Sequence, residues 1–587
     1  MYILGINAYH GDAAACLLKD GILLNAIEEE RIRRIKHWAG FPEEAIRFCL
    51  QDAGISIQDV EYITIGRNPS AHLLKKAVGA AFRWPDPKYI SDRLHNMRQV
   101  VSVKSQIARM FQLPEDRLRP RIRHIEHHRS HLASAFFTSP FEEAALISID
   151  GFGDYTSVMM GVGRGREIRI LQSITYPHSL GIFYTAFTQF LGFPHYGDEY
   201  KVMGLAPYGE PRLVPVLRQV IKPLPHGRFA LNTTYFGHTR TGVRMTWNNS
   251  APVLDNLYTD ALVQLLAPYG KPRRPDEPIE AFHRDLAASV QQTTEDLIFH
   301  LLHDLYQRTH IKNLCVAGGV AQNSVAMGKI RLMTDFENVY LPPAAYDAGT
   351  SFGSALWCYH QQLQQNHRAY VRSASLGSLF NDDQIEALLN ERQIPYRRME
   401  DKDQMVAVTA RLLAEGKVVG WFQGRTEFGP RALGNRSVLV HPGRPDAKDL
   451  LNSKIKRRES FRPFAPSILK EYVPEYFEQD DDVYFMEKVF RIRPEKRALI
   501  PAVTHVDGTG RLQTVHRDVS PLYYALIDTF RKITGLPILL NTSFNENEPI
   551  VNTPEQALDC FLRTEMDALV MGNCVVVRDQ PSPGSAE

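Results

Sequence analysis

The chain has 587 residues, and its 68 basic against 66 acidic side chains leave a formal net charge of +2. This length exceeds that of a single domain, and the near-neutral balance excludes a global electrostatic attraction to nucleic acid or anionic lipid. The six cysteines are far apart and form no C-x-x-C pair, which argues against a disulfide framework and a cysteine zinc site. No signal-peptide pattern occurs, and no apolar run reaches the roughly 20 residues of a membrane span. We therefore expect a cytoplasmic protein with no membrane or nucleic-acid partner.

The first part of the chain predicts strands and helices in alternation. Apolar runs at 2–8, 13–20 and 22–30 predict three strands, joined by the hairpin-type turns YHGD and KDG. A helix (42–54), a strand (61–67), a long helix (90–111), a strand (121–127) and a histidine-rich helix follow.

From Ala144 the pattern starts again. Strands are predicted at 144–150, 153–163 and 166–175, then helices at 181–193 and 279–306 and a strand that begins at 313. Each half has an acidic turn between its first two strands, with Asp12 in one and Asp154 in the other. The repetition predicts a structural duplication, and two such halves facing each other would form a cleft.

A third region of alternating helices and strands begins near residue 372 and extends to about Val577. The final residues, QPSPGSAE, read as disordered. The irregular segment 213–278, with NTTYFGHTRTGVRMTWNNS at its centre, is either a recognition insert or a cover for the fold. The helix content permits a homodimer.

HHRSHLASAFF, residues 127 to 137, places His127 and His131 four residues apart on a predicted helix. Residues i and i+4 share a helix face, so both imidazoles can bind one metal ion, whereas His128 points elsewhere. A metalloprotease helix would carry a glutamate between the two ligands. Arg129 and Ser130 stand there instead, which disfavours peptide hydrolysis.

Two aspartates complete a candidate ligand set. Asp150 ends the apolar strand AALISID, and Asp347 precedes a predicted helix in YDAGTSFG. Two histidines with two aspartates form a mixed nitrogen and oxygen set that is compatible with Fe(II), Mn(II) or Zn(II). The alternative is that the histidines only cap and solvate their helix.

CVAGGVAQNS, residues 315 to 324, predicts a strand, a glycine pair and the start of a helix. Backbone N–H groups and the helix dipole can bind a phosphate or a ribose there, and Gly318 and Gly319 allow close approach. Gly-Gly also forms tight strand-to-helix turns that bind nothing, so both interpretations stay open.

The third region contains a cationic patch. GRTEFGPRALGNRS and NSKIKRRESFRPFAPS combine phenylalanines and prolines with Arg425, Arg431, Arg436, Lys454, Lys456, Arg457, Arg458 and Arg462. A charge run is usually a solvated face, but rigid neighbours favour a shaped anion-binding pocket. Arg511 in a turn and the polar Asn541, Thr542 and Ser543 after the strand LPILLN suit a triphosphate or a ribose, although Asn-Thr-Ser also forms ordinary turns.

The motifs HHRSHLASAFF, DGFGD, GDEYKVMGLAPYG, AGGVAQNS, YDAGTSFG, FGPRALGNRS, FRPFAPS and LNTSFN together resemble the O-carbamoyltransferases of nodulation-factor and antibiotic biosynthesis. The resemblance extends from residue 3 to about 577. It implies an α/β fold with a duplicated actin-like (ASKHA) domain over 1–372, similar to the tRNA threonylcarbamoyladenosine transferase. It also implies a YrdC-like α/β domain with a twisted open sheet over 373–587, similar to the enzyme that makes threonylcarbamoyladenylate.

The implied reaction has two steps. The second domain makes carbamoyladenylate from carbamoyl phosphate and ATP, with release of phosphate and pyrophosphate, and the first domain transfers the carbamoyl group to a small-molecule hydroxyl with release of AMP. By resemblance, His127, His131, Asp150 and Asp347 bind a divalent metal, taken as Fe(II), with Zn(II) and Mn(II) as alternatives. The ATP and carbamoyl phosphate ligands implied in the same way are Arg431, Lys456, Arg462, Arg511, Asn541 and Ser543. Gly318, Gly319 and Asn323 would bind the adenylate in the first domain.

The base that deprotonates the acceptor is placed in the first hairpin. Many relatives carry an adjacent His-Asp pair there, whereas this chain has His10, Gly11 and Asp12. We hypothesise that His10 or Asp12 is the general base.

Other interpretations stay open. Carbamoyl transfer to a protein thiol, as in hydrogenase maturation, would come with an acylphosphatase domain and cysteine zinc fingers, which this sequence lacks. Threonylcarbamoyl transfer to tRNA would require threonine. A non-catalytic nucleotide-sensing protein on an actin-like fold would have no need of the cationic patch.

Overall fold

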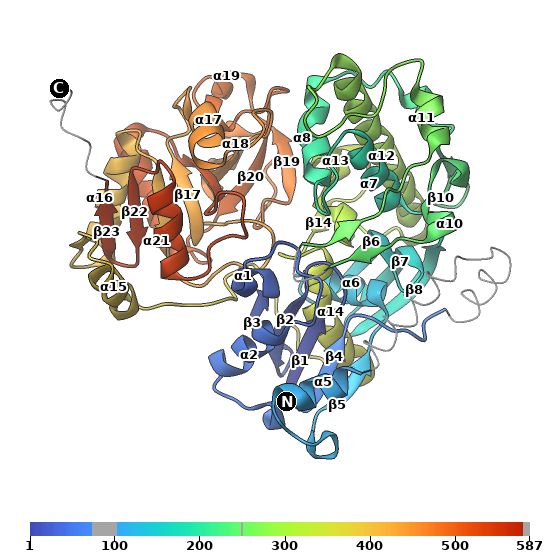
Figure 1. The fold of residues 1–587 in the computed structure, drawn as a ribbon, viewed down its shortest axis with the longest axis horizontal. Helices are drawn as coiled ribbons and strands as arrows, with labels where there is room; N and C mark the ends of the chain where they lie inside the picture. The colour runs from blue at the N-terminus through green and yellow to red at the C-terminus, as the bar shows by residue number, and fades with distance from the viewer. Residues whose placement is uncertain (73–101, 248–250, 579–587) are drawn as a thin grey trace. The chain divides into compact units, whose positions relative to one another are not determined.

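The computed structural model describes residues 1–72, 102–247 and 251–578. The chain divides into two compact units, Met1–Val371 and Arg372–Glu587, whose helices and strands are drawn in Figure 1. The part of the predicted helix at 90–101, the last three residues of NTTYFGHTRTGVRMTWNNS and the tail 580–587 lie outside the described residues. No helix in these described ranges has the length and apolarity that a bilayer crossing requires.

The first half of unit 1 contains a five-stranded sheet in the order β3-β2-β1-β4-β5. Its strands are β1 (Tyr2–Asn7), β2 (Ala14–Lys19), β3 (Ile22–Glu28), β4 (Tyr62–Ile65) and β5 (Arg121–His124). β1 is antiparallel to β2 and parallel to β4. The predicted strand at 121–127 is shorter than expected, because His127 already begins a helix.

The second half repeats this arrangement in the order β8-β7-β6-β13-β14. Its strands are β6 (Glu143–Gly153), β7 (Thr156–Arg164), β8 (Glu167–Thr175), β13 (Asn313–Ala317) and β14 (Asn338–Tyr340). β6 is antiparallel to β7 and parallel to β13, as β1 is to β2 and β4. The predicted duplication is therefore confirmed at the level of strand order and direction.

The α-helices in the described part of unit 1 are α1 (Glu29–Arg33), α2 (Glu43–Asp52), α5 (Val103–Met110), α6 (His127–Phe136), α7 (Leu180–Phe190), α8 (Glu199–Leu205), α9 (Val214–Leu217), α10 (His238–Thr241), α11 (Asp260–Leu266), α12 (Ala281–Thr309), α13 (Ser324–Met333) and α14 (Thr350–Trp357). α6 and α14 pack against each other, which brings residues 127 and 347 together although 220 positions separate them (347 − 127).

The segment predicted as an insert, 213–278, contains two small hairpins. They are formed by β9 (Ile221–Leu224) with β10 (Arg228–Leu231), and by β11 (Met245–Thr246) with β12 (Val253–Leu254).

Unit 2 is built on a nine-stranded mixed sheet in the order β15-β23-β22-β16-β17-β21-β18-β20-β19. Its strands are β15 (Arg397–Arg398), β16 (Val419–Phe422), β17 (Arg436–Val440), β18 (Ala465–Leu469), β19 (Lys488–Arg491), β20 (Thr509–Val515), β21 (Ile538–Ser543), β22 (Ala568–Met571) and β23 (Cys574–Val577). Its helices are α15 (Asp382–Glu391), α16 (Lys402–Ala414), α17 (Ala447–Leu450), α18 (Val473–Tyr476), α19 (Pro494–Arg497), α20 (Pro521–Thr534) and α21 (Pro554–Arg563).

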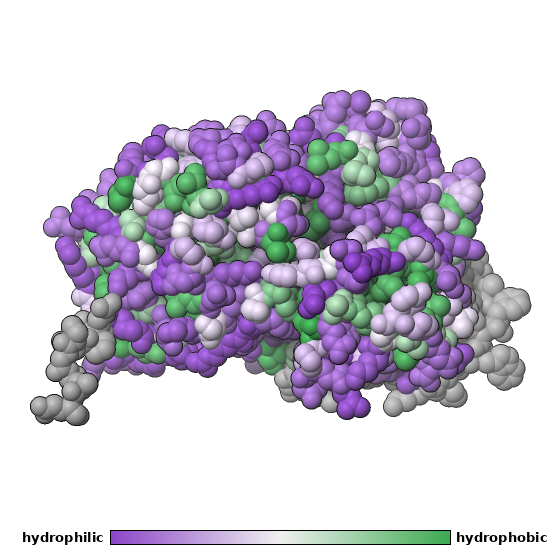
Figure 2. Space-filling model, turned by 90° about the horizontal axis from the view of Figure 1, so that it is seen from above, coloured by the Kyte–Doolittle hydropathy of each residue, from purple (hydrophilic) through white to green (hydrophobic). Residues whose placement is uncertain are grey.

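The apolar core of unit 2 consists of two clusters, one on each face of the sheet, because successive side chains of a strand point to opposite faces. Val438 and Val440 belong to one apolar cluster, while Leu439 belongs to another together with Trp421. Side chains of successive strand residues point to opposite faces, so the sheet is buried on both sides. The predicted α/β class is confirmed. On the face drawn in Figure 2, hydrophobic residues are scattered among hydrophilic ones.

Candidate metal centre and anion site

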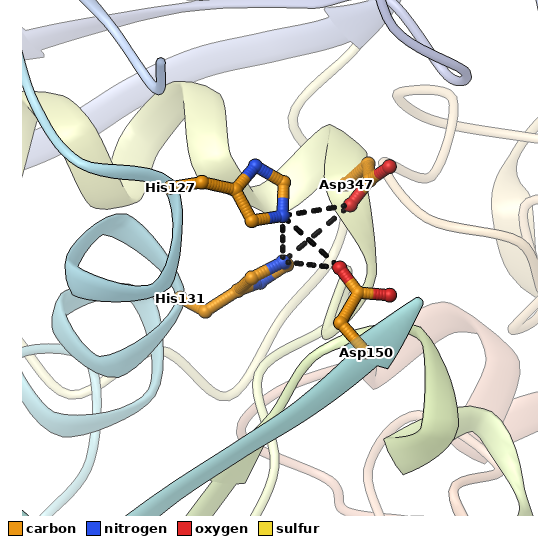
Figure 3. Close-up of side chains that lie close together, drawn as sticks. All are labelled: His127, His131, Asp150 and Asp347. Atoms are coloured by element: carbon orange, nitrogen blue, oxygen red, sulfur yellow. Dashed lines mark hydrogen bonds and ion pairs between the residues drawn. The ribbon is translucent and has the colours of Figure 1, made fainter. Parts of the chain in front are cut away.

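His127 and His131 lie on the first turns of α6 and are buried, at 3% and 0% exposure. Their Nε2 atoms are 3.0 Å apart and point toward the same space (Figure 3). The helix starts at this place because the Asp154 carboxylate, in the acidic turn of the second half, accepts the backbone N–H of His127 at 3.0 Å. An acidic side chain at a helix N-terminus satisfies a free amide and interacts favourably with the helix dipole.

Asp150 from β6 and Asp347 from the short helix η6 (Asp347–Gly349) complete the group. Asp150 Oδ2 is 3.0 Å from His127 Nε2 and 3.3 Å from His131 Nε2, and Asp347 Oδ1 is 3.4 Å from both nitrogens. One ligand atom from each of the four residues lies within 4.8 Å of the others. Ligands about 2.1 Å from a shared ion are themselves roughly 3.0–3.5 Å apart, so these spacings suit a common metal ion.

The charges of this group also favour a cation. Burial would raise the pKa of Asp347, but the His10 and His127 imidazoles outweigh it and hold that pKa well below its ordinary value. Asp347 Oδ1 is buried and has no hydrogen-bond partner among the described residues. Two ionised carboxylates and two imidazoles therefore offer a mixed donor set that fits a divalent metal and does not by itself select Fe(II).

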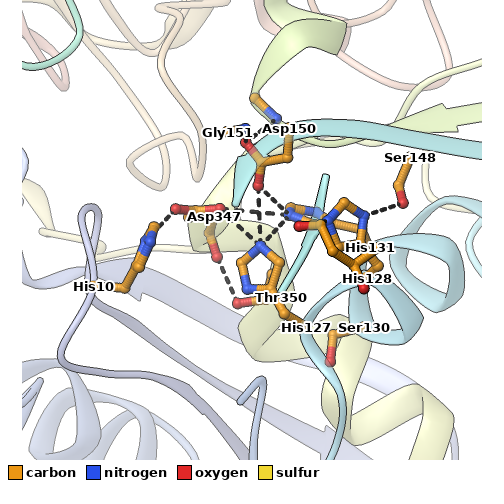
Figure 4. A network of polar contacts seen from close by, with 12 residues as sticks. His10, His127, His128, Ser130, His131, Ser148, Asp150, Gly151, Asp347 and Thr350 are labelled. Atoms are coloured by element: carbon orange, nitrogen blue, oxygen red, sulfur yellow. Dashed lines mark hydrogen bonds and ion pairs between the residues drawn. The ribbon is translucent and has the colours of Figure 1, made fainter. Parts of the chain in front are cut away.

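The second oxygen of Asp150 is fixed by the backbone. Asp150 Oδ1 accepts the N–H of Gly151 at 2.8 Å (Figure 4). It also accepts the N–H of Gly319 at 3.2 Å. A Cβ on residue 319 would be 2.8 Å from this oxygen, so glycine is needed for the approach. Gly319 thus supports a ligand of the metal group, whereas Gly318 donates its N–H to the Ala345 carbonyl at 2.8 Å. Binding of adenylate by the glycine pair stays a prediction.

The side-chain amide of Asn323 makes three hydrogen bonds within unit 1. Its Oδ1 accepts the Ala326 N–H at 3.1 Å, which caps α13, and its amide exchanges two hydrogen bonds of 2.9 Å with Gln291. One Nδ2 hydrogen is left for a ligand.

His128 turns away from the group, as predicted. Its Nδ1 accepts the Ser148 hydroxyl at 2.7 Å and its Nε2–H donates to the Thr156 carbonyl at 3.0 Å. Burial lowers its pKa to about 3, so the ring is a neutral part of the core.

The two residues proposed as a general base have different partners. His10 Nδ1 contacts Asp347 Oδ2, next to the metal group, whereas Asp12 Oδ1 binds His37 Nδ1 at 2.7 Å. A Cβ on Gly11 would be 2.4 Å from the Tyr196 hydroxyl oxygen, so the extra glycine accommodates this phenol.

His37 and Tyr196 were not identified from the sequence, because no spacing connects their loops to the first hairpin. Burial would lower the pKa of His37, but the Asp12 and Glu30 carboxylates raise it to about 9. The described residues thus contain a His37–Asp12 ion pair beside the turn that carries His10.

In unit 2, Lys456 follows the π-helical turn η8 (Leu451–Ile455) and is buried, at 1% exposure. Its ammonium contacts the Ser543 carbonyl and hydroxyl, and it donates to the Asn545 carbonyl at 2.8 Å and to Asn545 Oδ1 at 2.7 Å. Lys456 and Ser543, both predicted as substrate ligands, are therefore in contact, while their binding of substrate stays a prediction. Asn545 was missed because its role depends on the end of β21 folding back toward η8.

Three guanidinium groups act electrostatically on Arg511, which lies on β20. Burial lowers the pKa of Arg511 well below its ordinary value, and the charges of Arg431, Arg458 and Arg462 lower it further. Like charges in a desolvated position are unfavourable unless an anion offsets them. We refer to Arg431, Arg458, Arg462 and Arg511 as the arginine cluster.

Asn541 lies on β21, deeper in the same unit. It is 1% exposed, and its Nδ2 donates to Ser467 Oγ at 3.1 Å on the neighbouring strand. Its Oδ1 has no hydrogen-bond partner in the part of the chain that the structure describes. Ligand binding by Asn541 stays a prediction.

The cations of the predicted patch have different surroundings in the structure. Arg436 is fully buried, donates to the carbonyls of Gln423 and Gly424, and lies over the Phe422 ring at 3.6 Å. Lys454 and Arg457 instead pair with the acids Glu565 and Glu546 near the surface. These three cations thus have partners within the chain, whereas Arg431, Arg458 and Arg462 act on Arg511. Anion binding by the patch stays a prediction.

Comparisons with known proteins give consistent matches over both units. The sequence matches the family described as Carbamoyltransferase N-terminus over residues 2–356 and that described as Carbamoyltransferase C-terminus over 410–578. It is 40% identical to an uncharacterized protein of Synechocystis sp., with coverage of 98% of this chain and 97% of the relative. Nodulation protein NolNO of Sinorhizobium fredii is 36% identical, with coverage of 98% and 80%.

Solved structures give weaker similarity. HypF of T. kodakarensis matches with a TM-score of 0.33 and 13% identity over 62% of this chain and 48% of that chain. The ROK hexokinase of Thermus thermophilus matches with a TM-score of 0.29 and 14% identity over 61% and 98%. Similarity at this level implies nothing about function.

Proposed function

The chain belongs to the carbamoyltransferase family, and we propose that it is an ATP-dependent O-carbamoyltransferase acting on a hydroxyl of a small-molecule acceptor. The arginine cluster is the observation that carries this proposal. Its half-buried cations suit a polyanion such as ATP, and they lie in the unit that matches the carbamoyltransferase C-terminus.

In the first step, carbamoyl phosphate, ATP and one water give carbamoyladenylate, phosphate and pyrophosphate. Water cleaves carbamoyl phosphate to carbamate and phosphate, and a carbamate oxygen then attacks the α-phosphorus of ATP, so that pyrophosphate leaves. Arg431, Arg462 and Arg511 would offset the negative charge of the two substrates. Lys456 would act through Ser543, which it contacts.

In the second step, the acceptor oxygen attacks the carbamoyl carbon, the bond to the adenylate oxygen breaks and AMP leaves. A divalent metal held by His127, His131, Asp150 and Asp347 would supply positive charge for the adenylate phosphate and polarise the carbamoyl group. His10 or Asp12 would take the hydroxyl proton. The contact of His10 with Asp347 supports the first choice, and burial, which raises the pKa of Asp12, supports the second.

The first half-reaction can be tested without an acceptor. Purified protein is incubated with ATP, carbamoyl phosphate and Fe(II), and carbamoyladenylate and pyrophosphate are measured by mass spectrometry. We expect both products from the wild type and a loss of both in Arg431→Ala. A wild-type protein that consumes neither substrate with Fe(II), Mn(II) or Zn(II) would refute the proposal.

A further inference from the structure

The phenol of Tyr196 lies against the turn that carries His10. A Cβ on Gly11 would be 2.4 Å from the Tyr196 hydroxyl oxygen and 2.6 Å from the ring carbon that bears it. Gly11 directly follows His10, whose Nδ1 contacts Asp347 Oδ2 in the metal group (Figure 4). A side chain on residue 11 would therefore displace the phenol, so glycine at this position leaves room for Tyr196 beside the metal group.

The ring of Tyr196 is held on a second side by His37. The two rings meet edge to face, with centroids 5.3 Å apart and an angle of 80° between their planes. His37 is itself fixed, because its Nδ1 binds Asp12 Oδ1 at 2.7 Å and its backbone N–H donates to Glu30 Oε2 at 2.8 Å. The phenol thus packs between the His10 turn and a residue that is anchored to the same turn.

The hydroxyl of Tyr196 makes no hydrogen bond within the described ranges of the chain. The residue is half-buried, and a phenol in such a position usually has a partner for its O–H. The carboxylates of Asp12, Asp150 and Asp347 are close enough to act on it electrostatically, yet none of the three accepts its hydrogen. The O–H group beside the metal group is therefore available to a bound ligand.

The chemistry of the phenol limits what this ligand atom is. Burial, together with the charges of Asp12, Asp347 and Asp150, raises the pKa of Tyr196 well above its ordinary value, so the hydroxyl keeps its hydrogen at neutral pH. It is thus a hydrogen-bond donor, and it is not the base that takes the acceptor proton. During carbamoyl transfer, negative charge develops on the carbamoyl oxygen, and a fixed donor stabilises such charge.

We propose that Tyr196 is a catalytic residue of the second step, whose hydroxyl donates a hydrogen bond to the carbamoyl oxygen of carbamoyladenylate. This inference rests on the proposed function, because it takes carbamoyladenylate as the substrate of unit 1.

The step balances as follows in electrons and protons. As the acceptor oxygen bonds to the carbamoyl carbon, the electron pair of the C=O double bond moves onto the carbamoyl oxygen, and Tyr196 stabilises this charge while it keeps its own proton. The pair returns when the bond to the adenylate oxygen breaks, and AMP leaves with the electrons of that bond. The acceptor proton goes to His10 or Asp12.

A binding experiment on the full chain tests the contact. The probe is N-carbamoylsulfamoyl adenosine, a stable analogue that keeps the carbamoyl group of the adenylate and has a sulfamoyl group in place of the phosphate. Calorimetry gives its dissociation constant and that of AMP for the wild type and Tyr196→Phe. We expect the variant to bind the analogue about 3- to 10-fold more weakly, the usual effect of one neutral hydrogen bond. AMP has no carbamoyl group and should bind equally to both proteins.

A kinetic experiment tests the effect on the reaction. The protein is incubated with ATP and carbamoyl phosphate, with water as the acceptor, and AMP release above the rate without protein is measured. We expect Tyr196→Phe to lower this rate by about 100-fold, because removal of one donor to developing charge costs about 100- to 1000-fold. Pyrophosphate formed in the first turnover should be unchanged. If water does not serve as an acceptor for the wild type, the binding comparison decides.

Two further variants complete the test. Tyr269→Phe, at a tyrosine of unit 1 that is 50% exposed, should match the wild type in both experiments. Gly11→Ala keeps the phenol but displaces it, so it should lose affinity for the analogue as Tyr196→Phe does, and it replaces that variant if the latter does not fold, as judged by circular dichroism.

The outcomes separate a catalytic role from a structural one. Because the hydroxyl has no partner in the described chain, Tyr196→Phe should unfold in urea at the wild-type midpoint. A lower midpoint, an equal loss of affinity for AMP, or wild-type affinity for the analogue would overturn the inference. A wild-type protein that forms carbamoyladenylate but does not bind the analogue would overturn this inference alone, whereas one that forms no adenylate would overturn the proposed function as well.

Discussion

The two units bring together different kinds of ionisable side chains. Unit 1 brings the carboxylates of Asp150 and Asp347 to the same pair of imidazoles, and unit 2 brings the charges of Arg431, Arg458 and Arg462 to the half-buried Arg511. Each arrangement takes ionisable groups out of water, which costs stability. The carboxylates and imidazoles of unit 1 suit the proposed metal cation, and the guanidinium groups of unit 2 suit the proposed polyanion. Local cost of this kind is expected at functional sites.

The largest effect is expected when a candidate metal ligand of unit 1 is removed. His131 is 0% exposed, and its Nε2 faces both carboxylates. We expect His131→Ala purified with Fe(II) to lose the metal, so that mass spectrometry of metal content falls from about one ion per chain to near zero. His128→Gln on the same helix is the control and should keep its metal, because His128 points to Ser148. Equal metal content in both variants would contradict the assignment.

Neutralising one cation of the arginine cluster should lower the activity and raise the stability of unit 2. Arg511→Met removes a desolvated charge that three neighbouring cations disfavour. We expect adenylate formation to fall by about 100- to 1000-fold, the usual cost of removing one charge-stabilising group. Without ATP, unfolding of unit 2 in urea should need about 0.5–1 kcal/mol more free energy than in the wild type. A variant that is both less active and less stable would show that Arg511 has a structural partner instead.

The His37–Asp12 pair provides the contrasting case, because its opposite charges meet within the chain. The Asp12 carboxylate raises the pKa of His37 to about 9 from an ordinary value of 6.5, so the pair stabilises the fold fully below about pH 6.5. That contribution is lost as the pH rises through about 9. It amounts to about 3 kcal/mol at most, reduced by the partial exposure of the ring.

The measurement compares urea unfolding of the wild type and His37→Gln at pH 7 and pH 9.5. We expect the wild type to lose more stability over this range than the variant does. Parallel pH dependence in the two proteins would mean that the pair carries no net charge interaction.

The sequence predicted contacts that follow from local geometry. The spacing of His127 and His131 defines one face of a helix, and Asp150 follows a buried strand, so the sequence could place them together as a candidate metal group. The partners of Asp12 and Glu427 could not be predicted. His37 lies 25 positions from Asp12 in a different loop, and Glu427 binds amides that face it only because its own loop turns back.

The burial of Arg436 could not be predicted from its motif, for a different reason. It stands in a motif rich in cations, yet it begins β17, where alternation directs it to the same face as Val438 and Val440. Which cation of a patch is buried thus depends on strand register, and the register is set by pairing with distant strands such as β21.

The smallest expected effect concerns two lysines that the sequence does not distinguish. Lys454 is about half exposed and pairs with Glu565, whereas Lys456, two residues later, is buried against Ser543 and Asn545. A surface ion pair contributes little, so Lys454→Ala should change the free energy of unfolding by less than about 0.5 kcal/mol and leave adenylate formation unchanged. Lys456→Ala should destabilise unit 2 and impair adenylate formation, because it leaves buried acceptors without a donor. Urea unfolding and the pyrophosphate assay on both variants measure the difference, and equal effects would mean that burial does not decide which cations of the patch act.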